Sequence, residues 1–310
     1  MMVHARRVAL VALMLLSALG VDAHLSSAAN SVAAKRSRHT VSTTRHKTTR
    51  HVSRARRARR APPGGVYARC AVVIDPVTGT VLYEKNADRA APIASITKLM
   101  TAMVFLEQKP NLLRDVEVTR EEIYQGGHTQ LRDHEIVPLG DLLHMSLMCS
   151  DNVATRVLAR ESGLSHGEFM ARMNARAAEM GLKDTRFADP TGLDYNNVST
   201  ASDVARMLQT AAGNPLIHSI TTTASYEFAT QRRDHIINNT NRLLKSRYQI
   251  LGGKTGYISE SGYCFATWLR VDGRDLVAVV LGAPTNATRF ADVVRLVQRT
   301  VAAGFQPAKS

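Results

Sequence analysis

The sequence predicts an α/β fold with one mostly antiparallel sheet, helices around it and a helical lobe beside it. Three observations predict this: strand-like segments occur at both ends of the folded region, a long helical stretch separates them, and an amphipathic helix follows the last strand. A sheet made from both ends leaves the helical stretch as a lobe, and binding sites form where lobes meet. We therefore expect an active site between sheet and lobe.

The first strands form a hairpin. Cys70–Ile74 is β-branched and continuous, Asp75–Gly79 is a turn, and Thr80–Lys85 is a second strand. Helical spacing then dominates from about Ser95 to Ala212. The apolar residues with this spacing are Ile96, Leu99, Met100, Met103, Leu142, Leu143, Leu147, Val153, Val157 and Leu158.

Strands return after the helical stretch. They are predicted at Ser225–Ala229, His235–Thr240, Gln249–Gly256, Tyr263–Arg270 and Leu276–Leu281, with a turn at Val271–Arg274. The last helix carries Phe290, Val293, Val294, Val297 and Val301 on one face, which is typical of a helix that packs on a core.

Charge is unevenly distributed along the 310 residues. The net charge is +14, but residues 31–60 contain eleven Lys or Arg and no carboxylate, so residues 61–310 carry only +2. The folded part is nearly neutral, and we expect no nucleic-acid partner. The basic segment has too few apolar residues to fold, which predicts a disordered tether that contacts an anionic wall or membrane surface. A solvated linker without a partner is the alternative.

The N-terminus has the pattern of an export signal. Arg6 and Arg7 precede an apolar run, Val8–Leu19, that is short for a membrane span, and small residues follow it. We expect a signal peptide at 1–29, a basic linker at 30–65, a catalytic domain at 66–305 and a tail at 306–310. An uncleaved membrane anchor is the alternative. The predicted location is the periplasm, in soluble or loosely surface-associated form.

The cysteines predict neither a metal site nor a disulfide framework. Cys70, Cys149 and Cys264 lie far apart in the sequence, so a zinc cage is not expected, and an odd number leaves at least one thiol unpaired. Small buried side chains are the simplest interpretation. Whether two of them pair stays open.

Three short motifs carry the candidate chemistry. They are Ser95-Ile96-Thr97-Lys98, Ser150-Asp151-Asn152 and Lys254-Thr255-Gly256, and each pattern occurs once. Ser95 and Lys98 share a helix face. Burial lowers the pKa of a lysine, so Lys98 can act as the base that activates the Ser95 hydroxyl. The alternative is a helix N-cap serine beside a solvated lysine.

The other two motifs supply relay and binding groups. The Ser150 hydroxyl can relay a proton and the Asn152 amide can hold a substrate, with Asp151 in a structural role; a simple helix N-cap is the alternative. Lys254 and Thr255 can bind a carboxylate. Gly256 lets a ligand approach the backbone, although an exposed strand lysine would give the same pattern. The backbone N–H groups of Ser95 and Tyr257 are the candidate oxyanion hole.

Two further patterns are rejected. Gly163–Gly167 matches a nucleophile elbow, but a helix rather than a strand precedes it, and Ser165 with Glu168 predicts a capping box. Gly252–Thr255 resembles part of a phosphate-binding loop, but Tyr248 stands where its first glycine is required.

The three motifs together resemble the penicillin-recognising low-molecular-mass D,D-peptidases, the family of D-alanyl-D-alanine carboxypeptidases and endopeptidases. The resemblance covers about 66–305. Longer strings favour these peptidases over β-lactamases, and they are Pro92–Thr101, Asp189–Asp194, Asn197–Thr200, Asn239–Leu244 and Lys254–Ser259.

The resemblance implies a β-lactamase-like fold with a five-stranded sheet and a serine peptidase that cuts peptidoglycan stem peptides ending in D-Ala. It implies that Ser95 is acylated, that Lys98 is its base, and that Ser150 and Asn152 assist. Lys254 and Thr255 would bind the substrate carboxylate. β-Lactams would be covalent inhibitors, and no metal or organic cofactor is expected.

This sequence departs from the family pattern in two places. Cys149 stands where a small Ser or Ala is usual, and only about fifty residues follow Lys254-Thr255-Gly256. The short C-terminal part resembles the soluble periplasmic endopeptidase branch. Carboxypeptidase and endopeptidase activity are not separable from the sequence. A β-lactamase of the same fold and a non-catalytic, basic cell-wall-binding protein are the alternatives.

Overall fold

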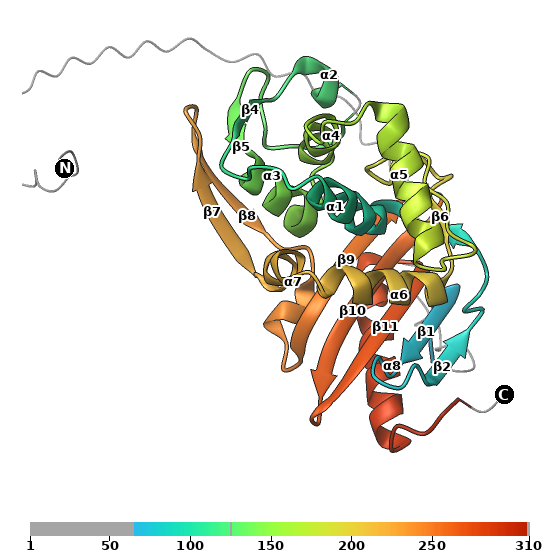
Figure 1. Ribbon diagram of the computed structural model, residues 1–310. Coiled ribbons are helices and arrows are strands. Elements are labelled where there is room, and N and C mark those ends of the chain that lie inside the picture. Colours follow the sequence, from blue (N-terminus) through green and yellow to red (C-terminus); the bar gives the residue numbers. More distant parts are fainter. Residues whose placement is uncertain (1–64, 125, 309–310) are drawn as a thin grey trace, which may run out of the picture. The chain divides into compact units, whose positions relative to one another are not determined.

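The sheet of the computed structural model, which describes residues 65–124 and 126–308, has five antiparallel strands. Their order is β2-β1-β11-β10-β9 (Figure 1). The strands are β1 (Cys70–Ile74), β2 (Val81–Lys85), β9 (Gln249–Ile258), β10 (Gly262–Val271) and β11 (Arg274–Ala283). The predicted sheet built from both ends of the folded region is confirmed. The expected signal peptide, and the expected linker up to residue 64, lie outside the described residues.

Both faces of the sheet are buried. Side chains alternate between the two faces along each strand. On β11, Val277 and Val279 pack in the core shared with the lobe, whereas Ala278 and Val280 pack in the core on the other face. Helix α8 (Asn286–Ala302) covers that second face with Phe290, Val293, Leu296 and Val297. The predicted packing role of the last helix is confirmed.

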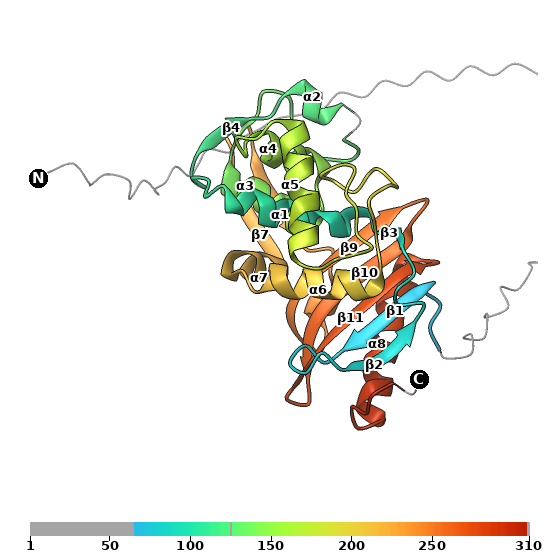
Figure 2. The same cartoon turned by 45° about the vertical axis from the view of Figure 1, so that its right-hand side comes forward.

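The helical lobe lies against the first face of the sheet. Helices α6 (Ala201–Ala212) and α7 (Pro215–Thr222) run across this face, on the opposite side from α8 (Figures 1 and 2). The remaining lobe helices are α1 (Lys98–Glu107), α2 (Arg120–Ile123), α3 (Leu139–His144), α4 (Asn152–Arg160) and α5 (His166–Glu179). No helix among the described residues is long and apolar enough to cross a membrane.

The helical stretch also contains short strand pairs that the helical periodicity did not predict. They are β3 (Ala91–Pro92) with β6 (Val198–Ser199), and β4 (Asp115–Glu117) with β5 (Ile136–Pro138). Segments of two or three residues show too little alternation to be recognised as strands.

Two predicted strands form a hairpin of their own. β7 (Ser225–Ala229) pairs with β8 (Asp234–Asn238), outside the five-stranded sheet. The hairpin packs on the lobe, where the Tyr226 ring stacks on His144 at 3.8 Å and its hydroxyl donates to Asp141. The buried His235 of β8 also bonds to Glu135 of the lobe, at 2.7 Å. β8 ends at Asn238, two residues before the predicted end.

Candidate active site

Ser95 lies at the junction of the sheet and the lobe, on a tight turn. The sequence predicts a helix start, but Ser95 belongs to a 3₁₀ turn, η1 (Ala94–Thr97), which precedes α1. The preceding residue, Ala94, has a left-handed backbone with φ of +49°. Such a conformation is costly for alanine and is found where surrounding structure fixes a functional group.

Two glycines allow neighbouring backbones to approach this turn. A Cβ on Gly192 would lie 2.1 Å from the Ala94 carbonyl oxygen, and one on Gly256 would lie 2.6 Å from the Ile93 carbonyl oxygen. Gly256 was expected to make room for a ligand. The structure shows a second reason for this glycine, which is close contact between β9 and the segment that carries Ser95.

Lys98 is fully buried, which excludes the alternative of a solvated lysine. Its Nζ is 2.7 Å from Asn152 Oδ1, 2.6 Å from the Thr191 carbonyl oxygen and 3.1 Å from Ser95 Oγ. A neutral amine has two N–H bonds and one lone pair. When the amine is neutral, its two N–H bonds go to the amide and carbonyl acceptors, and the lone pair is left for the Ser95 hydroxyl.

Burial sets the protonation of Lys98. It lowers the pKa of this amine from 10.5 to about 7, partly opposed by the negative charges of Asp189 and Asp151. Desolvation disfavours the charged form of a lysine, and this is the main cause. A substantial fraction of Lys98 is therefore neutral near pH 7, as a general base requires.

Ser150 and Asn152 lie on either side of Asp151, the N-cap residue of α4. Ser150 ends a π-helical turn (Met145–Cys149) with a left-handed backbone, φ +66°. Asp151 caps α4 by accepting from the Ala154 N–H, and it also accepts from the Thr129 hydroxyl. The predicted structural role of Asp151 is confirmed. Because Asp151 provides the cap, the N-cap explanation does not account for its two neighbours.

Lys254 faces Ser150 across the site. It is almost fully buried, so it is not an exposed strand lysine, and its Nζ donates to Ser150 Oγ at 2.8 Å and to the Thr255 carbonyl at 3.0 Å. Burial and the charge of Lys98 lower the Lys254 pKa. The Thr255 hydroxyl lies 2.7 Å from the Thr240 hydroxyl. The structure thus brings all three motifs together at one place.

Tyr257 follows Gly256 on β9, the edge strand of the sheet. Its ring is half exposed and stacks on Tyr263 at a centroid distance of 4.2 Å. Gly256 lies against Ser95, because a Cβ on this glycine would be 3.1 Å from the Ser95 backbone nitrogen. The oxyanion role expected for the Ser95 and Tyr257 N–H groups stays a prediction.

Three residues at the site were not singled out by the sequence analysis. Thr191 and Thr240 lie within two of the family-like segments, Asp189–Asp194 and Asn239–Leu244. The Thr191 carbonyl contacts Lys98 and the Thr240 hydroxyl contacts Thr255, both outside those segments. Arg289 is on α8, where only apolar residues were considered. Its guanidinium donates to the Gly256 carbonyl at 2.9 Å, and burial lowers its pKa to about 10. No short motif marks Arg289, so nothing local identifies it.

The cysteines are free. Cys70 and Cys264 are buried and Cys149 is partly buried. Burial raises the pKa of the Cys149 thiol to about 12, so this neighbour of Ser150 is protonated and is not a competing nucleophile. Within 65–124 and 126–308, no group of His, Cys, Asp or Glu residues has the arrangement of a metal site.

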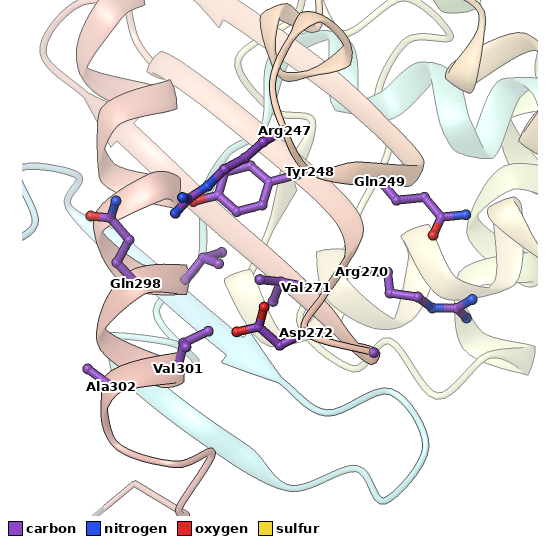
Figure 3. A pocket seen from close by; sticks show the side chains of 11 residues that line it. Arg247, Tyr248, Gln249, Arg270, Val271, Asp272, Gln298, Val301 and Ala302 are labelled. Carbon is purple, nitrogen blue, oxygen red and sulfur yellow. The ribbon is translucent and has the colours of Figure 1, made fainter.

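Two cavities lie near strand β9. One of about 330 Å³ includes Asn239 and Asn241, on either side of Thr240. A further cavity of about 560 Å³ lies at the beginning of β9, away from Lys254. Figure 3 shows Arg247 and Tyr248 on one side of that cavity, with Gln298, Val301 and Ala302 of α8 opposite.

Comparison with known proteins gives a consistent result. A family model described as D-alanyl-D-alanine carboxypeptidase matches residues 56–285. A D-alanyl-D-alanine endopeptidase of Pseudomonas aeruginosa is 36% identical over 231 residues, 73% of this chain and 74% of that protein. A D-alanyl-D-alanine carboxypeptidase of Mycobacterium tuberculosis is 31% identical over 226 residues, 69% of this chain and 76% of that protein.

A solved structure has the same fold. The crystal structure of the Streptomyces K15 DD-transpeptidase matches with a TM-score of 0.73 and 26% identity, over 76% of this chain and 98% of that one. The predicted fold class is confirmed.

Proposed function

Because this chain belongs to the D-alanyl-D-alanine carboxypeptidase family of serine peptidases, we propose that Ser95 is acylated by the D-Ala carbonyl of a stem peptide. The chain is a penicillin-binding DD-peptidase that acts on the cell wall. One observation carries the residue assignment. The buried Lys98 amine lies 3.1 Å from Ser95 Oγ, and it also bonds to Asn152 Oδ1 and the Thr191 carbonyl oxygen.

Acylation begins with proton transfer. The neutral Lys98 amine takes the Ser95 proton, and Oγ attacks the carbonyl carbon of the substrate. The resulting oxyanion is held by the backbone N–H groups of Ser95 and Tyr257. When the C–N bond breaks, the proton that Lys98 took from Ser95 passes through the Ser150 hydroxyl, which accepts a hydrogen bond from Lys254, to the leaving amine. Lys98 is then neutral again.

Deacylation reverses the proton path. Lys98 takes a proton from water, the oxygen of that water attacks the Ser95 ester, and the proton returns to Ser95 Oγ as the acid product leaves. Thr255 and Lys254 hold the substrate carboxylate, in a positive field to which the nearby Arg289 contributes. Asn152 holds the Lys98 amine and a substrate amide.

We further propose that the preferred substrate is a cross-linked stem peptide, which makes the enzyme an endopeptidase. This is supported by endopeptidases of Pseudomonas aeruginosa and Escherichia coli that are 36% and 33% identical to the chain over 231 residues. Purified muropeptides test it. Conversion of dimers to monomers is expected, whereas loss of D-Ala from monomers with intact dimers would indicate a carboxypeptidase.

Export to the periplasm, and contact of the basic segment with an anionic surface, are also proposals. They are supported by the signal-like residues 1–29 and by the eleven cations of residues 31–60. A chain beginning at Ala61 should keep full activity on soluble muropeptides but bind sacculi or anionic vesicles less tightly at low salt. The comparison is a chain that begins near His24 and keeps the basic segment. Equal binding by these two chains at every salt concentration would identify the segment as a spacer.

A further inference from the structure

A small polar cavity adjoins the catalytic residues on the Thr255 side. It has a volume of about 330 Å³ and is lined by Ala224, Asn239, Asn241, Arg242, Leu244 and Lys245. Thr240 lies between two of these residues, and its hydroxyl is 2.7 Å from the Thr255 hydroxyl. The cavity is therefore next to the proposed carboxylate-binding strand.

The cavity is positively charged. Of the six residues that line it, Arg242 and Lys245 are cationic and none is acidic. Arg242 and Lys245 are exposed, and among the described residues neither has a carboxylate within 4.0 Å. The Arg242 guanidinium lies 5.9 Å from the centre of the Phe290 ring, on the helix that also carries Arg289. Its charge acts on Arg289, which bonds to Gly256.

The position of the cavity relates it to one end of the substrate. In the proposed mechanism the scissile carbonyl oxygen lies at the Tyr257 N–H, and the carboxylate of the leaving residue lies at Thr255, two residues back along β9. Gly253 is two residues further back, and a Cβ on it would lie 3.1 Å from Nδ2 of Asn241, which lines the cavity. A terminal D-Ala ends at its own carboxylate. The leaving half of a cross-linked substrate continues past it and carries additional carboxylates.

We propose that Arg242 and Lys245 form a subsite for the leaving peptide of a cross-linked substrate and bind one of its carboxylates. This inference rests on the proposed endopeptidase function and names residues that favour cross-linked over terminal substrates. Arginine suits this role because its planar guanidinium binds a carboxylate through two parallel hydrogen bonds.

The test compares two substrates in one protein. The double variant Arg242→Ala/Lys245→Ala is assayed as the full chain on a cross-linked muropeptide dimer and on a monomeric pentapeptide. We expect kcat/KM to fall about tenfold for the dimer and less than about twofold for the monomer, since only the dimer loses charge-assisted contacts. Arg242→Lys should lose part of the dimer cleavage, because lysine keeps the charge but not the two parallel hydrogen bonds.

Arg247→Ala is the matched control. Arg247 is an exposed cation that follows Lys245 closely in the sequence, but it lines the separate cavity of about 560 Å³ (Figure 3). It should leave both activities unchanged. Equal losses on dimer and monomer in the double variant, the same dimer defect in Arg247→Ala, or no defect would each overturn the subsite.

Penicillin labelling separates this inference from the function on which it rests. If the unmodified chain forms the penicillin adduct and releases D-Ala but leaves dimers intact, the subsite is wrong and the peptidase assignment stands. If it forms no adduct, the proposed function fails and the subsite fails with it.

Discussion

The lobe side of the active site (Ser95, Lys98, Ser150 and Asn152) and its sheet side (Lys254, Thr255 and Gly256) hold polar groups on contrasting backbones. Two left-handed residues, Ala94 and Ser150, lie on the lobe side. The sheet side is a regular stretch of β9, paired along its length with β10. The groups proposed to transfer protons therefore lie at or just after two left-handed residues, whereas the groups proposed to bind the carboxylate lie on a regular edge strand.

The largest expected effect is on the nucleophile of the lobe side. Ser95→Ala removes the only atom proposed to be acylated, so covalent labelling by a fluorescent penicillin should disappear. The side chain is small and half-buried, and the unfolding midpoint should be unchanged. A normal adduct in this variant would contradict the assignment.

The second-largest effect is expected at Lys98, the proposed base on the lobe side. Lys98→Ala should slow acylation by about 10²–10⁴, the usual contribution of a positioned general base. The measurement is the rate of penicillin adduct formation by stopped-flow or quench. Lys183→Ala, which removes an exposed lysine, is the control and should react at the normal rate. A loss of less than tenfold in Lys98→Ala would assign the base elsewhere.

Gly256→Ala tests the contact between the two sides. The added Cβ would meet the Ile93 carbonyl oxygen at 2.6 Å, so the strand or the Ser95 turn must move. We expect unfolding to become easier by about 1–3 kcal/mol, as overpacking costs, together with slower acylation. Chemical denaturation and adduct formation measure the two effects.

Gly167→Ala is the matched control for that substitution. A Cβ there has no heavy atom within 4 Å, and Gly167 lies in helix α5. It should be neutral or stabilise by about 1 kcal/mol or less. Similar behaviour of the two variants would remove the argument for a close contact at Gly256.

The smallest effect is expected on the sheet side. Thr240→Val removes one hydroxyl that contacts the Thr255 hydroxyl, and a net hydrogen bond of about 1 kcal/mol corresponds to about a fivefold change. The change should appear in KM for carboxylate-bearing substrates, with kcat nearly constant. A fall in kcat with an unchanged KM would place Thr240 with the proton-transferring groups.

The two sides also differ in how well the sequence predicts them. Strands that contain Val72, Val277 and Val279 are predicted by continuous apolar, β-branched runs, and the three motifs identify the polar groups at the site. The bond from Lys98 to the Thr191 carbonyl joins residues that are 93 positions apart, and the Arg289 contact joins α8 to β9. Such contacts depend on tertiary packing and have no local signal.

Local conformation was also difficult to predict. The sequence predicts that Ser95 begins a helix, but Ser95 lies in a 3₁₀ turn, and the backbone at the start of this turn is in close contact with Gly192 and Gly256. The strands β7 and β8 were recognised by their residues, yet alternation does not specify which partner a strand chooses.

The central claim is that burial makes Lys98 a base near neutral pH, and the pH dependence of acylation tests it most directly. Its pKa is lowered from 10.5 to about 7, so the neutral form is lost as the pH falls through about 7. The second-order rate of penicillin acylation should therefore fall about tenfold per pH unit below this value and stop rising above it. A rate that keeps rising toward pH 10, or that does not change between pH 5 and 9, would contradict the account.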